Sequence, residues 1–201
     1  GDAESGSSEI RRDILENDWL DAIIQLSTDQ FMNTGISTYI WVCSKDKPVY
    51  RAGKVQLIDA SNCYEPRRKS IGTKRNDITD YCRDLIVQAY EQFKNGAIYG
   101  DKTGIYCQSK IFDINEFGYH KIVVEHPQRD EKGNIITKKG KPIPDTDLRD
   151  TENVPMNEDV DEYFKREVLP YAQDAWIDKK KTKVGYEIPM TRYFYEYKSI
   201  S

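Results

Sequence analysis

Apolar residues in the first sixty positions fall into short runs that are separated by polar turns. An apolar run at 22–26 predicts a first strand, the run at 37–44 is rich in β-branched and aromatic residues, which favours a second, and a third run follows at 55–59. The segment 9–16 precedes the first run and has helical periodicity, with its apolar residues on one face. A helix that is followed at once by a strand is typical of α/β units. The pattern therefore predicts three strands at the closing edge of a larger α/β sheet.

The remainder of the chain is less regular. Apolar positions at helical spacing predict a long helix over 77–93. Beyond residue 129 the chain becomes polar, and short runs on either side of TKKGK predict a small hairpin. A second helix is predicted over 158–168, and the aromatic segment 186–197 is predicted to be a strand or a pinned arm. These patterns divide the chain into two predicted domains, residues 1–128 and a C-terminal extension, residues 129–201, that holds the hairpin or loop, the second helix and the aromatic segment.

Composition narrows the class of protein. The 201 residues carry a net charge of −4, so the chain as a whole is not drawn to nucleic acid and any such contact requires a local basic patch. Aromatic residues make up 11% of the chain, which argues against disorder. No apolar run is long enough to cross a membrane. The four cysteines form no CxxC pair, so we expect free, buried or half-buried thiols in a cytoplasmic protein.

Signals for an independent catalytic site are missing from the sequence. It contains no GxGxxG turn and no P-loop, and no serine or cysteine lies in a recognisable hydrolase motif. His120 lies in a predicted strand, and DVDE at 159–162 is predicted to be a helix surface, not a calcium loop. We therefore predict no catalytic, cofactor or metal site in this chain. A helix and strand with no nucleotide-binding strand before them favour a piece of a longer enzyme, although a complete small α+β domain is the alternative.

Two groups of residues are candidates for ligand contact. Phe31 lies in the loop after the first predicted strand, and ligands of open α/β sheets bind at the carboxyl ends of strands. An exposed aromatic ring there can stack on a nucleic-acid base, whereas a buried ring would anchor the loop in the core. The segment 62–76 is predicted to be a basic loop whose hydroxyl groups, glycine and cations suit phosphate oxygens, but a solvated surface loop has the same composition. Its cations are Arg67, Arg68, Lys69, Lys74 and Arg75.

Several stretches resemble one known family. Residues 1–47, followed by GKVQLIDAS at 53–61, are similar to the modification (methyltransferase) subunit of type I restriction–modification systems. RDTENVP at 149–155, DAWID at 174–178 and KTKVGYEIPMTRYFYEY at 181–197 are similar to the C-terminal part of the same subunit. The resemblance therefore covers nearly the whole chain.

The resemblance implies an adenine-N6 DNA methyltransferase that uses S-adenosylmethionine and has a Rossmann-like sheet. In that family the methyl-donor motif and the Asn-Pro-Pro-aromatic motif precede the segment seen here, and neither occurs in this sequence. The resemblance thus implies the last three strands of the methyltransferase sheet with appended α+β elements, so that residues 1–128 are the C-terminal half of the catalytic domain with a helical insertion. The short connections favour antiparallel neighbours, whereas the family places its last strand between the previous two.

The resemblance also assigns roles to the candidate residues. Phe31 matches the aromatic residue that stacks on the flipped target adenine, and the five cations become candidates for DNA phosphate contact. Implied partners are DNA and the specificity and restriction subunits, and the isolated chain is expected to bind no cofactor and to be inactive. A non-catalytic docking module for the specificity subunit is the alternative, while the net charge argues against a free-standing nucleic-acid binder.

Overall fold

The computed structural model describes Ala3 and residues 5–195, which belong to two compact units. The five-strand unit comprises residues 14–114 and the chain from 188 onward, and the hairpin unit comprises residues 1–13 and 115–187. Two of the three points of division fall within elements, the helix α1 (Gly6–Glu16) and the 3-10 helix η2 (Ile114–Phe117). The boundary predicted between residues 128 and 129 differs from this division, because it separates one strand of the hairpin unit from its pairing partners.

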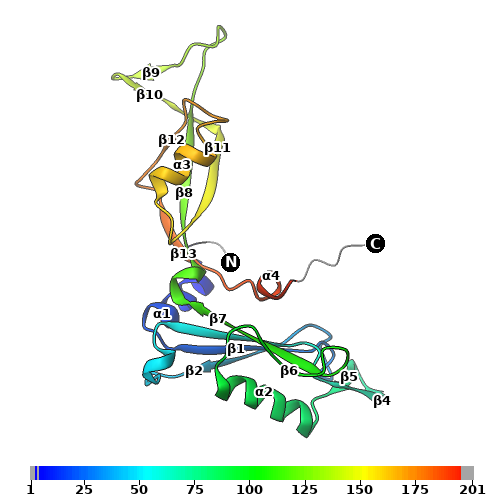
Figure 1. Cartoon of the computed structure of the whole chain (residues 1–201). Helices are drawn as coiled ribbons and strands as arrows, with labels where there is room; N and C mark the ends of the chain where they lie inside the picture. Colours follow the sequence, from blue (N-terminus) through cyan, green and yellow to red (C-terminus); the bar gives the residue numbers. More distant parts are fainter. Residues whose placement is uncertain (1–2, 4, 196–201) are drawn as a thin grey trace. The chain divides into compact units, whose positions relative to one another are not determined.

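The five-strand unit is built on a mixed sheet with the strand order β2-β1-β3-β7-β6. β1 and β3 are parallel, whereas the other neighbours in this sheet are antiparallel. The helix α2 lies along the sheet (Figure 1). The elements of this unit are β1 (Leu20–Leu26), β2 (Tyr39–Cys43), η1 (Val49–Arg51), β3 (Lys54–Ala60), β4 (Glu65–Ile71), β5 (Lys74–Asp77), α2 (Asp80–Gln92), β6 (Ala97–Gly100), β7 (Tyr106–Asp113) and α4 (Met190–Phe194).

The three strands predicted from the apolar runs exist. Their order differs both from the series of antiparallel neighbours that the short connections favour and from the family arrangement, in which the last strand lies between the previous two. β1 and β2 are antiparallel neighbours, as their short connection predicts. β3, however, does not pair with β2 and does not lie between the other two strands. It runs parallel to β1 on the side away from β2, so that Ile24 is opposite both Ile40 and Ile58. The connection at 44–53, which includes η1, carries the chain past β1 and makes this parallel pairing possible.

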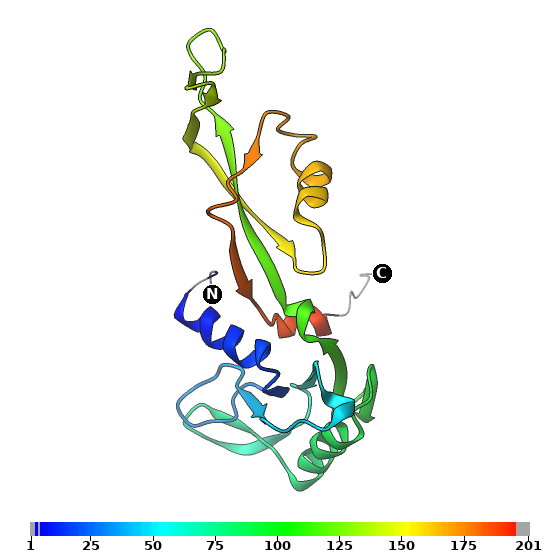
Figure 2. The same ribbon diagram turned by 90° about the vertical axis from the view of Figure 1, so that its left-hand side faces the viewer.

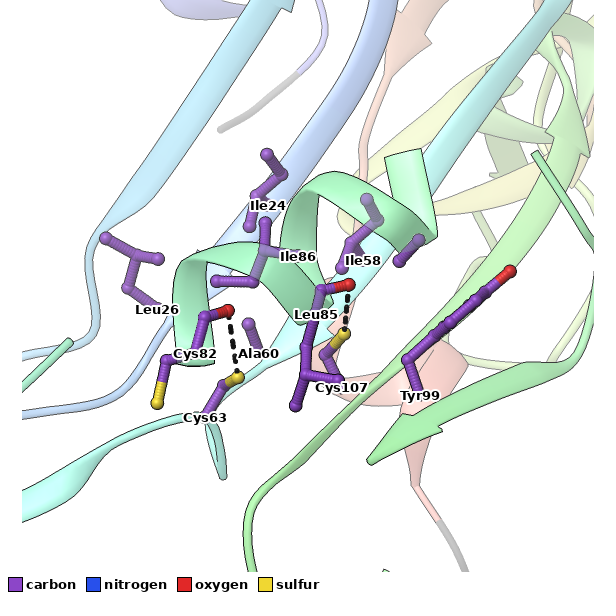
Figure 3. Packing of buried hydrophobic residues seen from close by; sticks show 11 residues of the cluster. Ile24, Leu26, Ile58, Ala60, Cys63, Cys82, Leu85, Ile86, Tyr99 and Cys107 are labelled. Carbon is purple, nitrogen blue, oxygen red and sulfur yellow. Dashed lines mark hydrogen bonds between the residues drawn. The ribbon is translucent and has the colours of Figure 1, made fainter. Parts of the chain in front are cut away.

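One face of this sheet is closed by α2. Thr79 caps the helix by accepting a hydrogen bond from the backbone amide of Cys82. Figure 3 shows the packed side chains, with the Cys63 and Cys107 thiols each donating to a carbonyl of α2. Cys43 is exposed on β2, so the prediction of four buried or half-buried thiols is wrong at that position. The buried cluster contains Ile24, Leu26, Ile58, Ala60, Cys63, Cys82, Leu85, Ile86, Ala89, Tyr99 and Cys107.

β2 is an outer strand of the sheet with an apolar sequence. Tyr39, Ile40 and Trp41 are 45%, 46% and 42% exposed, although each pairs with a residue of β1. Among the described residues, β2 has no strand neighbour on its other side. Outer strands are usually short or protected by charged residues and proline, because an open apolar edge promotes pairing with another strand. The edge of β2 therefore offers an unprotected surface for a further strand.

The hairpin unit is organised around β8, which pairs antiparallel with three other strands. β11 lies along one side of it, and β12 and β13 follow one another along the other side (Figure 2). The helix α3 supplies Phe164 to a core that also contains Ile122, Val124 and Val154. The elements are β8 (Gly118–Pro127), β9 (Thr137–Lys138), β10 (Lys141–Pro142), β11 (Pro144–Pro155), α3 (Val160–Glu167), β12 (Trp176–Ile177) and β13 (Lys183–Tyr186).

Two predictions for the C-terminal third need correction. The polar segment after residue 129 contains the long strand β11, which its lack of aliphatic residues conceals. The segment 186–197, predicted to be extended, contains the end of β13 and the short helix α4, and residues 196–197 lie outside the described structure. The small hairpin is confirmed as β9 and β10. Its turn residues Lys139 and Gly140 both have positive φ, as a type I′ turn requires.

Candidate nucleic-acid interface

The loop that carries Phe31 leaves the carboxyl end of β1. Because β1 and β3 are parallel, with Leu26 opposite Ala60, the segments that follow both strands begin at the same edge of the sheet. Phe31 is 50% exposed, so its ring is not a buried anchor of the loop. Gln30 takes that role, since it is buried and its side-chain amide donates to the Ser27 hydroxyl. The loop thus turns one side chain into the core and presents the next one to solvent.

The basic segment after β3 forms a hairpin, so the prediction of a loop at 62–76 is corrected. β4 and β5 pair antiparallel around the two-residue turn Gly72-Thr73. Gly72 has a φ of +61°, which is the conformation of the first turn residue in a type II′ hairpin and favours glycine there. The hairpin places all five predicted cations on one small element at the edge of the sheet where Phe31 lies.

The hairpin lies directly against the Phe31 loop. The Thr73 amide donates to the carbonyl of Met32 at 2.9 Å, and the Thr73 hydroxyl donates to the carbonyl of Phe31 at 2.9 Å. The Asn76 side-chain amide donates to the Thr28 carbonyl at 2.9 Å, and two backbone amides of β5 donate to the Asp29 carbonyl. The structure therefore brings the predicted stacking residue and the predicted phosphate contacts into a single surface.

The five cations of this surface differ in their availability. Arg67 donates both to Asp77 Oδ1 at 2.8 Å and to Asp77 Oδ2 at 2.6 Å, and Lys74 lies 3.1 Å from Asp77 Oδ1. Hydrogen bonds from Arg67 and then from Lys74 hold the pKa of Asp77 below its usual value. These two cations consequently help to hold the hairpin together.

The other three cations are exposed. Arg68, Lys69 and Arg75 form no ion pair within the part of the chain that the structure describes. Met32 and Ile36 add exposed apolar area to the same loop, with 56% and 71% of their surfaces accessible. An exposed aromatic ring beside available cations is an arrangement that suits a nucleic acid, because bases stack on the ring while phosphates pair with the cations.

Sequence reasoning missed the residues that join the two halves of this surface, Gly72, Thr73 and Asn76. A Gly-Thr pair between two short basic runs is a recognisable signal for a hairpin turn. Their contact with the Phe31 loop had no such signal, because it depends on the parallel pairing of β1 with β3.

The hairpin unit contains a pocket of about 380 Å³ that includes His120, Ile177 and Thr182 in its lining. The carboxylates around it already have partners: Asp159 caps α3, while Glu158 pairs with Arg166 and Asp161 with Lys179. Within the described ranges, no three His, Cys, Asp or Glu side chains are grouped to hold a metal ion. No described helix is long and apolar enough to cross a membrane.

Comparison with known proteins places these observations in context. A family model described as N-6 DNA Methylase matches residues 3–133. The type I restriction enzyme MjaIX methylase subunit of Methanocaldococcus jannaschii is 32% identical over 114 residues, which are 57% of this chain and 18% of that protein. The MjaVIII methylase subunit of the same organism is 33% identical over 109 residues, 53% of this chain and 17% of that protein.

A solved structure is also similar. It is the type I restriction–modification methyltransferase subunit from Streptococcus thermophilus, with 24% identity, a TM-score of 0.44, and coverage of 56% of this chain and 20% of that one. The chain thus spans less than a fifth of the length of the two Methanocaldococcus relatives.

Proposed function

Because the chain belongs to the N-6 DNA methylase family, we propose that it is the C-terminal part of the catalytic domain of a type I restriction–modification methyltransferase subunit. The whole subunit transfers a methyl group from S-adenosylmethionine to N6 of adenine in DNA, in a complex with specificity and restriction subunits. The chain alone supplies a DNA-binding surface and no methyl transfer. The observation that carries this proposal is the juxtaposition of Phe31 with the basic hairpin, in a chain whose relatives are named as methylase subunits.

The residues present do not fit a site for S-adenosylmethionine. A nucleotide cofactor in an α/β sheet needs close backbone approach at a glycine-rich turn after a parallel strand. The segments after β1 and β3 instead begin Ser27-Thr28-Asp29 and Ser61-Asn62. The sequence Asn153-Val154-Pro155 lies at the end of β11, with Val154 in the core, and does not match the catalytic tetrapeptide. We therefore assign cofactor binding to a part of the subunit outside this sequence.

The open edge of β2 supports the same assignment. Ile40 lies on the sheet face that α2 covers, since it is opposite Ile24 of the α2 core, while Tyr39 and Trp41 lie on the other face. A strand that is apolar on both faces is typical of the interior of an α/β sheet. We propose that the strands of the donor-binding half continue the sheet from this edge, with β1, β2 and β3 among its last strands and with β7 and β6 following on the far side of β3.

Phe31 is proposed to stack on the adenine after the base has left the duplex. Extrusion of a base costs a few kcal/mol, and stacking on an aromatic ring offsets about 1–3 kcal/mol of that cost. Arg68, Lys69 and Arg75 are proposed to pair with phosphates next to the extruded nucleotide. Arg67 and Lys74 contribute less directly, because Asp77 already neutralises part of their charge.

The Phe31 assignment is tested in the longer subunit assembled with its specificity subunit. Phe31→Ala should lower the rate of tritiated methyl transfer by roughly 5- to 150-fold, the equivalent of the stacking energy. Stability should change little, because the ring is half exposed. Val49→Ala is the matched control, since it removes an apolar side chain that is 93% exposed elsewhere on the same unit. Normal methylation by Phe31→Ala would remove Phe31 from the proposal.

Cofactor binding gives a second test. Titration of S-adenosylmethionine into the 201-residue chain in a calorimeter should release no binding heat, whereas the longer subunit should bind it. Saturable binding to the chain alone would contradict the assignment of the donor site to another part of the subunit.

A second candidate function is that of a docking module for the specificity subunit. Residues 134–187 lie beyond the family match, yet they supply Val154, Phe164 and Ala175 to a core of their own with β8. Tyr171 is 90% exposed on this unit. Retention of the 201-residue chain by an immobilised specificity subunit, abolished by changes at Tyr171 and unaffected by Phe31→Ala, would favour this function.

A further inference from the structure

The turn of the basic hairpin holds the backbone of the Phe31 loop directly. Thr73 donates two hydrogen bonds, one from its amide to the carbonyl of Met32 and one from its hydroxyl to the carbonyl of Phe31, both at 2.9 Å. The carbonyls on either side of the Met32 Cα are therefore fixed by a single residue of the hairpin. The orientation of the Phe31 backbone then depends on the position of Thr73.

The packing at the turn leaves no room for adjustment. A Cβ atom on Gly72 would lie 2.5 Å from the carbonyl oxygen of Met32, which is far inside van der Waals contact. On the other side of the loop, a Cβ on Gly35 would lie 2.9 Å from Asp29 Oδ1. Asp29 itself has a φ of +57°, and its carbonyl accepts from the amides of Arg75 and Asn76. The loop backbone is thus held against the hairpin by these hydrogen bonds and by the close approach of Gly72.

We infer that Thr73, supported by the close approach of Gly72, is a positioning residue for Phe31 and couples phosphate contact to base stacking. The inference rests on the proposed function and adds to it. Cations on both sides of the turn, Lys69 and Arg75, pair with phosphates and hold the hairpin on the duplex. Since the turn also holds the Phe31 backbone, the ring is placed by the same contact that holds the DNA.

This coupling makes a distinct kinetic prediction. The cations contact DNA before and after base extrusion, whereas the ring of Phe31 contacts the base only after it has left the duplex. Displacement of Phe31 should therefore lower kcat and leave KM for DNA nearly unchanged, because it weakens an interaction that forms late. Loss of the cations should raise KM instead and reduce the salt dependence of binding.

The first test compares two substitutions of Thr73 in the assembled methyltransferase. Thr73→Val keeps the shape of the side chain and removes the hydroxyl, so kcat should fall by roughly 5-fold, as expected for one hydrogen bond, with KM within about 2-fold. Thr73→Ser retains the donor and should restore kcat. A rise in KM at constant kcat, an unchanged kcat, or a failure of Thr73→Ser to restore the rate would overturn the inference.

The second test uses Gly72→Ala, which forces the turn away from Met32. A displacement of this kind should lower kcat by about 10²-fold, because moving a group of the active site by about 1 Å can cost that much of the rate. Gly96→Ala is the matched control, since Gly96 has a similar φ of +74° and nothing within 4 Å of its Cβ position. It shares the positive φ without the contact and should leave kcat unchanged.

Amide hydrogen exchange on the 201-residue chain gives a readout that does not require activity. Thr73→Val should accelerate exchange in a peptide covering 27–38 and leave β3 protected. Equal exchange of this peptide in Thr73→Val and in the native chain would overturn the inference. Failure of the inference and of the proposed function are separable. If Phe31→Ala loses activity while Thr73→Val does not, the stacking role stands and the positioning role falls.

Discussion

A buried ion pair ties the end of α2 to the sheet, and its removal has a large predicted effect on stability. Arg51 and Asp21 are 2% and 3% exposed, and Arg51 Nη1 lies 3.0 Å from Asp21 Oδ1. The Arg51 guanidinium also donates to the Tyr90 carbonyl and lies over the Tyr90 and Phe93 rings, 4.2 Å and 4.3 Å from their centroids. The Tyr90 hydroxyl donates to the second oxygen of Asp21. We consider Arg51→Met, which keeps the apolar stem and removes the charge.

The magnitude follows from the burial of the partner. Without the guanidinium, Asp21 keeps one hydrogen bond from Tyr90 and remains a buried carboxylate. Removing one partner of a buried ion pair costs about 3–5 kcal/mol, chiefly because the remaining charge stays desolvated. With a urea dependence of about 2 kcal/mol per M, the unfolding midpoint should fall by about 1.5–2.5 M.

The assay is urea unfolding followed by tryptophan fluorescence in a Trp176→Phe background, so that Trp19 and Trp41 report on the five-strand unit alone. Arg83→Met is the matched control, because Arg83 pairs with Asp80 on the surface of α2 and such a pair contributes about 0–1 kcal/mol. The double variant Arg51→Met with Asp21→Leu should recover part of the loss. A midpoint for Arg51→Met equal to that of Arg83→Met, or no recovery in the double variant, would refute the reasoning.

Three further predictions concern other parts of the molecule. Burial raises the pKa of Glu125, but the hydrogen bonds from Lys181 and Arg149 lower it by more, so the pKa lies below its usual value. The ionised Glu125 therefore contributes to stability fully above the unfolded pKa of about 4.3, and this contribution is lost as the pH falls through the folded pKa. Trp176 emission should therefore show less acid destabilisation in Glu125→Gln than in the native chain, and equal acid sensitivity would contradict this. Ile40→Lys should reduce self-association of the chain in sedimentation experiments, because charge on an open strand edge blocks pairing; unchanged association would mean that β2 is not the site. Ellman's reagent should react quickly with one thiol, Cys43, and with all four cysteines after unfolding, and rapid reaction of two or more in the native chain would contradict the packing of Cys63, Cys82 and Cys107.

The sequence predicts the elements of the five-strand unit better than their arrangement. The apolar runs and the helical stripe of α2 are local patterns, and β1, β2, β3 and α2 form close to their predicted positions, whereas β4 and β5 fall in a predicted loop and β6 was not predicted. The partner of β3 is not a local property. It depends on whether the ten residues after β2 turn back or pass β1, and no residue in that connection decides between the two. β11 was missed for a related reason, since its polar residues are stabilised by pairing with β8 and not by an apolar stripe of their own.

For the candidate site, too, the sequence predicts the residues better than their arrangement. Phe31 and the cations could be selected from their residue types and from the position of the loop after a strand. Their proximity could not, because the hydrogen bonds between Thr73 and the Phe31 loop join residues about forty positions apart in the chain. The separation of the cations into those paired with Asp77 and those without a pair also requires the hairpin register, in which Glu65 is opposite Asp77.

The position of β8 has a consequence for the choice of chain limits in expression experiments. The family match ends at residue 133, a few residues after β8, whereas every strand that pairs with β8 begins at residue 144 or later. A recombinant piece trimmed to the matched region would keep Ile122 and Val124 and discard the side chains that cover them. Such a piece would carry a ten-residue strand with both edges open, and we expect it to precipitate or to be degraded, so that the limit of sequence similarity is a poor guide to the limit of stable folding.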